Sequence, residues 1–322
     1  MSPLVLNVGL LVVGVGILYI GAEWLVRGSS RLATSLGISP IVVGLTVVSF
    51  GTSAPELVVA LIAALNDNSD LAMGNVMGSN LANIGLILGI TAIVRPMDVA
   101  ARVVSREIPV MLALTILLFP LAQDGNLGLI EGIALFTILL FYLAFINSAA
   151  GEEAPEIGQA FEEYAGTKEE LTTKVAWMDF VLVILGSTGL VLGGTAIVRS
   201  AEFLAMSFRI PDVIVGLTIV AIGTSLPELA TALVAAIRGE ADIAVGNIIG
   251  SNIFNIAAIL GITSMVTPIT VNPEILTREL PAVLLLSLIV LPVTRIGLRV
   301  YRWEGAILLT CYFTITGWLI LF

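Results

Sequence analysis

The sequence predicts an all-α polytopic membrane protein with ten transmembrane helices in two inverted five-helix repeats. Three observations indicate this fold class: an apolar composition, ten long apolar runs and a sequence pattern that occurs twice. Of the 322 residues, 58% are hydrophobic and 12% are charged, and the charged share is about half that of an average soluble domain. This composition excludes a water-soluble globule, a disordered chain and a coiled coil.

The charged and reactive residues exclude several functional classes. The chain has 14 Lys and Arg against 24 Asp and Glu, a net charge of −10, which argues against a nucleic-acid partner because phosphate binding needs clustered basic residues. There is no His, and Cys311 is the single cysteine. An internal disulfide, an imidazole metal site and a Ser–His catalytic pair are therefore excluded. We expect no cofactor and no obligate protein partner, whereas the lipid bilayer is required.

Ten apolar runs are long enough to be transmembrane helices. About 20 apolar residues of helix cross a hydrocarbon core of roughly 30 Å. The runs are continuous and do not alternate with period two, which argues against a β-barrel. The expected spans are 4–26, 40–65, 71–94, 107–122, 127–147, 178–198, 211–237, 241–266, 279–294 and 303–322.

The basic residues predict the orientation of these spans. Loops that follow odd-numbered spans contain 11 of the 14 basic residues, and loops that follow even-numbered spans contain 3. Because cytoplasmic loops carry the excess of Lys and Arg, we expect the odd-numbered loops to be cytoplasmic. Both termini would then be extracellular in a multi-pass protein of the cell membrane.

The second half of the chain repeats the first at a constant offset of 172 residues. Between 38–64 and 210–236, 16 of 27 positions are identical, and between 72–91 and 244–263, 13 of 20 are identical. Each repeat contains five spans, and because five is odd, the second must enter the membrane inverted, as in many secondary transporters. We expect a first repeat over 1–150, an acidic cytoplasmic connector over 151–176 and a second repeat over 177–322. A calcium-sensing role for the connector is less well supported, because it lacks the spacing of an EF-hand.

Glu56 and Glu228 occupy equivalent positions near the middle of spans 2 and 7. A carboxylate at this depth costs at least about 2.5–3.5 kcal/mol and usually faces a functional cavity. Both follow the sequence Gly-Thr-Ser-x-Pro, and each proline removes a backbone donor and breaks the helix locally. Thr52 and Thr224 precede the glutamates by four residues and are expected on the same helix face.

Spans 3 and 8 supply the opposite wall in the motif Gly-Asn-x-x-Gly-Ser-Asn. We expect its glycines to allow close helix approach and its asparagines to form interhelical hydrogen bonds. Ser79 and Asn83 are four residues apart, and so are Ser251 and Asn255. Every candidate ligand is a hard oxygen, which favours Ca²⁺ and Na⁺.

These paired motifs resemble those of the calcium/cation antiporter superfamily, in particular the prokaryotic sodium/calcium exchangers. The resemblance covers all ten spans and implies exchange of about three Na⁺ for one Ca²⁺, driven by the sodium gradient. It also implies that spans 1 and 6, which are rich in glycine, slide across a rigid remainder. The metal ligands that it implies are Glu56, Glu228, Thr52, Thr224, Ser53, Ser225, Ser49, Ala221, Ser79, Asn83, Ser251 and Asn255, with Ser49 and Ala221 acting through their carbonyls.

Two departures from the family pattern narrow the expected activity. Position 255 is Asn, whereas potassium-dependent members carry Asp there, so potassium transport is not expected. The long regulatory loop of animal members is also missing, which argues against calcium regulation by separate domains.

Two alternatives remain from the sequence. An H⁺-coupled antiporter for Ca²⁺ or another cation would use the same two buried carboxylates to carry protons. An intramembrane enzyme is disfavoured, because no His or mid-membrane Lys is present to activate a serine. We therefore expect a transporter and not an enzyme.

Overall fold

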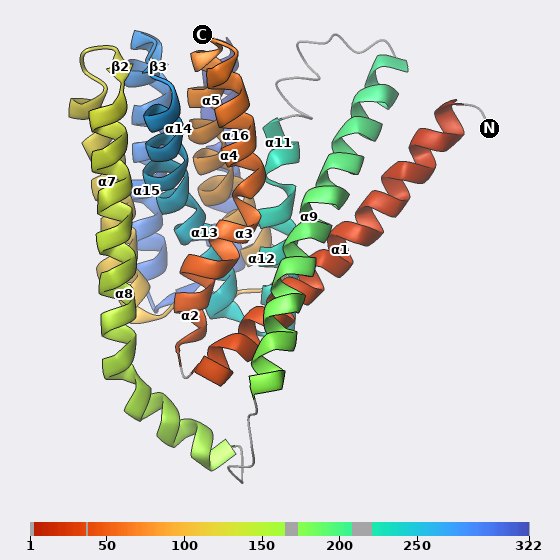
Figure 1. The fold of residues 1–322 in the computed structure, drawn as a ribbon, viewed down its shortest axis with the longest axis vertical. Coiled ribbons are helices and arrows are strands. Elements are labelled where there is room, and N and C mark those ends of the chain that lie inside the picture. Colours follow the sequence, from red (N-terminus) through yellow and green to blue (C-terminus); the bar gives the residue numbers. More distant parts are fainter. Residues whose placement is uncertain (1–2, 37, 165–172, 208–220, 322) are drawn as a thin grey trace.

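The computed structural model describes residues 3–36, 38–164, 173–207 and 221–321, which are mostly helical (Figure 1). Eight helical segments in this part of the chain are long and apolar enough to cross a membrane. A further span consists of residues 40–52 and 54–65, bent by 45° at the break between them. The expected span 211–237 lies partly outside the described residues, so the number of ten remains a prediction.

The described elements follow the expected order, with π-helical turns, labelled η, inside several spans. The first half contains α1 (Pro3–Leu36), α2 (Pro40–Val43), η1 (Gly44–Val48), α3 (Ser49–Thr52), α4 (Ala54–Leu65), α5 (Ser69–Leu81), η2 (Ala82–Ile87), α6 (Leu88–Val94), β1 (Met97–Asp98), η3 (Val103–Glu107), α7 (Ile108–Leu121), β2 (Asn126–Leu127) and α8 (Leu129–Tyr164). The second half contains α9 (Thr173–Ser207), α11 (Ala221–Thr224), α12 (Leu226–Arg238), α13 (Ala241–Phe254), η5 (Asn255–Leu260), α14 (Gly261–Val266), β3 (Ile269–Thr270), η6 (Ile275–Glu279), α15 (Leu280–Arg295), β4 (Arg299–Val300) and α16 (Arg302–Leu321).

The expected connector is partly helical. α8 continues through residues 151–164 and ends at Tyr164, and α9 begins at Thr173. Residues 151–164 contain five Glu and two Ala, which have high helix propensity. The helix therefore extends into the segment expected as the connector.

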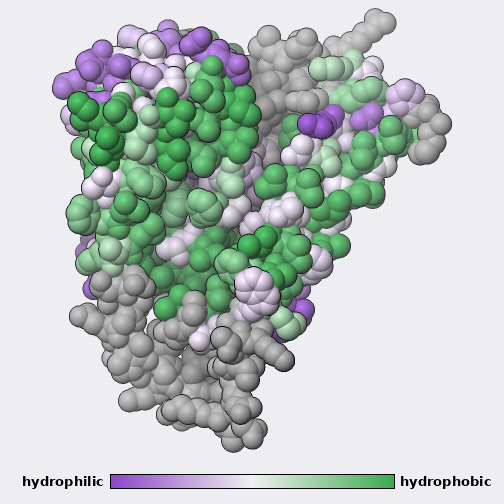
Figure 2. All heavy atoms as spheres, viewed as in Figure 1, coloured by the Kyte–Doolittle hydropathy of each residue, from purple (hydrophilic) through white to green (hydrophobic). Residues whose placement is uncertain are grey.

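Two spans form the centre of the molecule. In the segment Ala241–Val266, the most apolar stretch is completely buried, and in Ser69–Val94 the corresponding stretch is 83% buried. In Pro3–Ser35 only 17% of this stretch is buried. The central spans carry the repeated asparagines and serines, so polar groups lie inside the bundle and apolar side chains face outward. Figure 2 shows this apolar surface as a broad band below a hydrophilic end.

α1 and α9 pack against each other through glycine at one side of the bundle (Figure 1). A Cβ atom at Gly21 would meet the Gly186 carbonyl, and one at Gly186 would meet the Gly21 carbonyl. Gly14 and Gly193 show the same reciprocal relation. Gly14 corresponds to Gly186, and Gly21 to Gly193, at the offset of 172 residues. Reciprocal contacts of this kind arise between units that are related by a two-fold axis.

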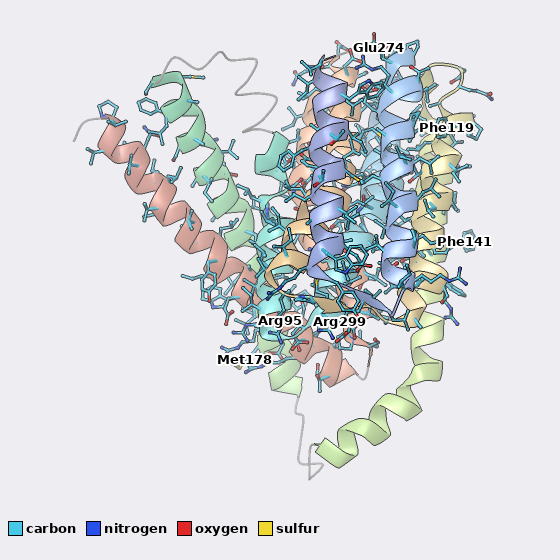
Figure 3. The ribbon with its side chains drawn as sticks, turned by 180° about the vertical axis from the view of Figure 1, so that it is seen from behind. Arg95, Phe119, Phe141, Met178, Glu274 and Arg299 are labelled. Atoms are coloured by element: carbon cyan, nitrogen blue, oxygen red, sulfur yellow. The ribbon has the colours of Figure 1, made fainter. Side chains whose placement is uncertain are left out.

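Two short ribbons join the halves at opposite ends of the bundle. β1 pairs with β4, and β2 pairs with β3, both antiparallel. Figure 3 shows Arg95 and Arg299 at one end, beside the first ribbon, and Glu274 at the other end, where α1 begins and α16 ends in Figure 1. The loops after spans 3 and 9 therefore share one face, and those after spans 4 and 8 share the other.

Candidate cation site

Two helix breaks at equivalent positions form the base of the site. Ser53 separates α3 from α4 with φ −84° and ψ 4°, and Ser225 separates α11 from α12 with φ −88° and ψ 5°. Pro55 and Pro227 lie in the first turn of the following helix, where a missing N–H is tolerated. The sequence motif therefore produces the same local geometry twice.

Each break places a glutamate in the first turn of a helix. Glu56 lies in α4 and Glu228 in α12, and each is 1% exposed. The positive end of the helix dipole favours an anionic group there. Ser53, which directly precedes the helix of Glu56, donates a hydrogen bond to Glu228, so both glutamates lie where the two halves meet.

The central helices bring amide groups to the same level. Asn83 lies in η2, which packs against α12, and Asn255 lies in η5, which packs against α4. Each amide thus lies on an element that contacts the glutamate-bearing helix of the other half. Asn83 and Asn255 are each 1% exposed.

Several hydrogen bonds in the site connect the two halves. Ser53 Oγ donates to Glu228 Oε1 at 3.1 Å, and Thr52 Oγ1 donates to Asn247 Oδ1 at 3.0 Å. Asn255 Nδ2 donates to Asn80 Oδ1 at 3.0 Å. These bonds hold the two motifs in register across the interface.

The site also contains buried oxygens without a hydrogen-bond partner among the described residues. They are Glu56 Oε1 and Oε2, Glu228 Oε2, Asn83 Oδ1, Asn255 Oδ1, Asn252 Oδ1 and Ser251 Oγ. An unsatisfied buried polar group costs about 1–3 kcal/mol, and a charged one more. A bound cation would remove this cost, because it accepts electron density from several oxygens at once. The donor set therefore fits a hard cation.

The other expected ligands have different environments. Ser225 Oγ donates to Ser79 Oγ at a long 3.5 Å, and Thr224 is half-buried while Thr52 is fully buried. The Ser49 hydroxyl donates away from the carboxylates, to the carbonyls of Gly44 and Asn247. Ala221 begins α11.

The glycines of the second central helix meet the expectation of close approach. A Cβ at Gly246 or Gly250 would meet the backbone of the span that contains η1. Among the described residues, no heavy atom lies within 4 Å of a Cβ position at Gly74 or Gly78. The segment that corresponds to η1 in the second half, residues 216–220, lies outside the described residues, so the expectation for these two glycines remains a prediction.

The asparagines of these motifs contribute more to the site than the sequence suggested. Asn80 and Asn247 each bond a candidate ligand from the other half and retain an unpartnered amide nitrogen. Asn252 instead donates within its own helix, to Ile248. The described residues contain no cluster of three or more Asp, Glu, His or Cys side chains that would bind a metal, so a cation here depends on neutral oxygens as well as on the two glutamates.

A family comparison accounts for this arrangement. The model of the sodium/calcium exchanger protein family matches residues 6–147 and 178–321. The chain belongs to the sodium/calcium exchanger family. Members of this family are transporters and not enzymes, and the many apolar helices agree with a multi-pass membrane protein.

Individual exchangers and related proteins match over nearly the whole chain. The inner membrane protein YrbG of Escherichia coli is 40% identical over 89% of this chain and 88% of its own. The sodium/calcium exchanger MaX1 of Methanosarcina acetivorans is 32% identical over 96% of this chain and 97% of its own. A structure of the sodium-calcium exchanger NCX_Mj superposes with a TM-score of 0.84 at 29% identity, and covers 98% of this chain and 99% of the other.

Proposed function

We propose that this protein is a secondary active antiporter that exchanges Na⁺ for Ca²⁺ across the cell membrane. A single midplane site with two glutamates would bind the ions and open alternately to each side. The observation that carries this proposal is the set of buried, unpartnered oxygens around Glu56 and Glu228. The chain's membership of the exchanger family supports the same conclusion.

The charge of the site explains why occupancy by the two ions would be exclusive. Two carboxylates balance one Ca²⁺ or two Na⁺, and a third Na⁺ would leave one net positive charge. Ca²⁺ takes six to eight oxygens at about 2.3–2.6 Å in flexible geometry, which the carboxylates, amides and hydroxyls offer. When either species fills the site, the other must leave, and this coupling is the basis of exchange.

Alternating access would come from α1 and α9 moving together across the remaining helices. Gly21 and Gly186 allow direct backbone contact between α1 and α9, so the pair can move as one unit. The central helices are buried and would stay fixed. We further propose that the face with Arg95 and Arg299 is cytoplasmic, because most basic residues lie in its loops.

Uptake of radioactive Ca²⁺ into proteoliposomes tests this function. Vesicles loaded with Na⁺ are diluted into Na⁺-free buffer, and a parallel sample has a pH gradient alone. We expect uptake only with internal Na⁺, and loss of uptake in Glu56→Gln and Glu228→Gln. Glu274→Gln, at a carboxylate that is 68% exposed, is the matched control and should transport normally. Uptake driven by pH and indifferent to Na⁺ would instead favour a proton-coupled Ca²⁺ antiporter.

A further inference from the structure

A cavity of about 280 Å³ lies beside the candidate site, between α4, α9, α11 and α12. Its walls include Pro55 and Pro227, each next to a glutamate in sequence, together with Gly223 and Thr224. α9 contributes Thr195 and Arg199. The cavity therefore connects the repeated motifs with the helix pair that we propose to move.

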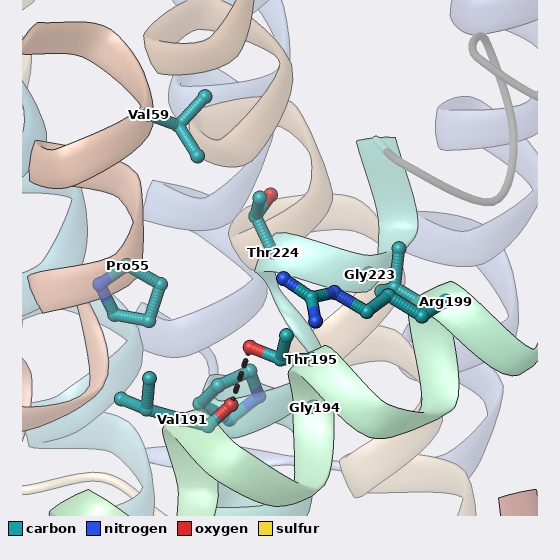
Figure 4. Close-up of a pocket in the computed structure, with 10 residues that line it drawn as sticks. Pro55, Val59, Val191, Gly194, Thr195, Arg199, Gly223 and Thr224 are labelled. Atoms are coloured by element: carbon teal, nitrogen blue, oxygen red, sulfur yellow. Dashed lines mark hydrogen bonds between the residues drawn. The ribbon is translucent and has the colours of Figure 1, made fainter. Parts of the chain in front are cut away.

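Arg199 is the one charged residue among the ten that line this cavity. It is exposed, and Figure 4 shows its guanidinium extending towards Thr224 and Thr195. The hydroxyl of Thr195 donates to the Val191 carbonyl at 2.7 Å. No carboxylate in the described part of the chain forms an ion pair with Arg199. A fixed positive charge thus lies next to a route for cations.

The equivalent residue in the first half does not share this position. Arg27 corresponds to Arg199 at the offset of 172 residues and is not among the residues that line the cavity. Arg199 lies near the end of α9 that shares a face with the β2–β3 ribbon (Figure 1). Arg27 is therefore a matched control, an exposed arginine that does not line this cavity.

A fixed positive charge discriminates between cations by their valence. At about 10 Å in water, one unit charge weakens the binding of a monovalent cation about 2-fold and of a divalent cation about 4-fold. The Debye length is about 30 Å at 0.01 M ionic strength and about 8 Å at 0.15 M. The effect is therefore strong in dilute buffer and weak at physiological salt concentration.

We propose that Arg199 is a specificity-determining residue that lowers the affinity of this cavity for Ca²⁺ more than its affinity for Na⁺. It would promote release of Ca²⁺ to the face on which the cavity lies and disfavour rebinding. This inference rests on the proposed exchange function, because it assumes that the cavity gives access to the two-glutamate site.

Equilibrium binding of ⁴⁵Ca²⁺ to the purified full-length protein in detergent tests the role of Arg199. The half-saturating Na⁺ concentration is measured by displacement of ⁴⁵Ca²⁺. In low-salt buffer, Arg199→Gln should lower the half-saturating concentration of Ca²⁺ about 4-fold and that of Na⁺ about 2-fold. Both changes should shrink when choline chloride raises the ionic strength. Arg199→Lys retains the charge and should resemble the unmodified protein, as should Arg27→Gln.

The outcomes separate this inference from the proposed function. The proposed role of Arg199 is overturned if Arg199→Gln and Arg199→Lys have equal effects on ion binding. It is also overturned if Arg199→Gln changes the binding of Ca²⁺ and Na⁺ equally, or changes neither. If Glu56→Gln and Glu228→Gln both leave the ⁴⁵Ca²⁺ binding of the protein unchanged, or if the unmodified protein binds no ⁴⁵Ca²⁺, the proposed exchange function itself is wrong.

Discussion

Ser53 donates a hydrogen bond to the carboxylate of Glu228, 175 residues further along the chain. The bond occupies Oε1 and leaves Oε2 without a partner among the described residues. Ser53 lies at the break of its own span and directly precedes α4, which carries Glu56. One serine therefore links the two glutamates and directs a free oxygen of Glu228 into the interface between the halves.

Replacing Ser53 with alanine should weaken Ca²⁺ binding. A hydrogen bond to a charged group contributes about 1.5–3 kcal/mol, so we expect roughly tenfold or more weaker binding by ⁴⁵Ca²⁺ titration. Ser225→Ala is the matched control at the equivalent position. Its hydroxyl makes only a 3.5 Å contact with Ser79, so its loss should have a smaller effect. Equal effects of the two substitutions would show that the Ser53–Glu228 bond has no special role.

Gly21→Ala should slow exchange without removing ion binding. The new methyl group would lie 2.7 Å from the backbone nitrogen of Leu190 and 2.9 Å from the Gly186 carbonyl oxygen, and would force α1 and α9 apart. A barrier increase of about 1.4 kcal/mol slows transport about tenfold. Initial rates of Ca²⁺ uptake and equilibrium Ca²⁺ binding are measured on the same preparation.

Gly16→Ala serves as the control for this substitution. Gly16 has no heavy atom within 4 Å of its Cβ position, so transport should be unchanged. A comparable slowing in Gly16→Ala would indicate that helix propensity, and not the contact between α1 and α9, limits the rate.

Gly250→Ala should lower stability. The added methyl group would lie 2.7 Å from the Leu45 carbonyl oxygen, and overpacking of this kind costs about 1–3 kcal/mol. Thermal unfolding in detergent should give a lower Tm for Gly250→Ala than for Gly16→Ala, where no described heavy atom lies within 4 Å of the Cβ position. Equal Tm values for the two variants would contradict close packing at Gly250.

Tyr142→Phe should reduce stability and leave transport intact. Glu107 is buried between α7 and α8, where Tyr142 donates to Oε2 and Arg102 to Oε1. Loss of the hydroxyl leaves a buried carboxylate oxygen unsatisfied, at a cost of about 1–3 kcal/mol. Tm and Ca²⁺ uptake are compared with those of Tyr301→Phe, at a residue that is 41% exposed. A selective loss of uptake without a change in Tm would assign this cluster to transport instead.

Much of the fold could be predicted from the sequence because the bilayer imposes strong constraints. Long apolar runs identify the spans, and Pro55 after Gly51 indicated a local break in the helix, which the structure places at Ser53. The pairing of β1 with β4 could not be predicted, because a two-residue strand has no detectable periodicity. The point at which α8 ends could not be predicted, because a charged segment shows no apolar run that marks the end of a helix.

The sequence indicated which residues to expect in the candidate site, but it indicated few of the contacts between them. The repeat pointed to Glu56 and Glu228, since carboxylates at this depth usually face a functional cavity, and the structure buries both directly after a helix break. Arg199 escaped notice, because its position next to the cavity depends on how α9 packs against α12.

Anomalous diffraction from crystals of the protein soaked in Ca²⁺ would test the central claim most directly. We predict one strong peak within about 2.3–2.6 Å of carboxylate oxygens of both Glu56 and Glu228, and its disappearance when the soak contains high Na⁺. A Ca²⁺ peak elsewhere in the molecule, with none between the two glutamates, would contradict the account.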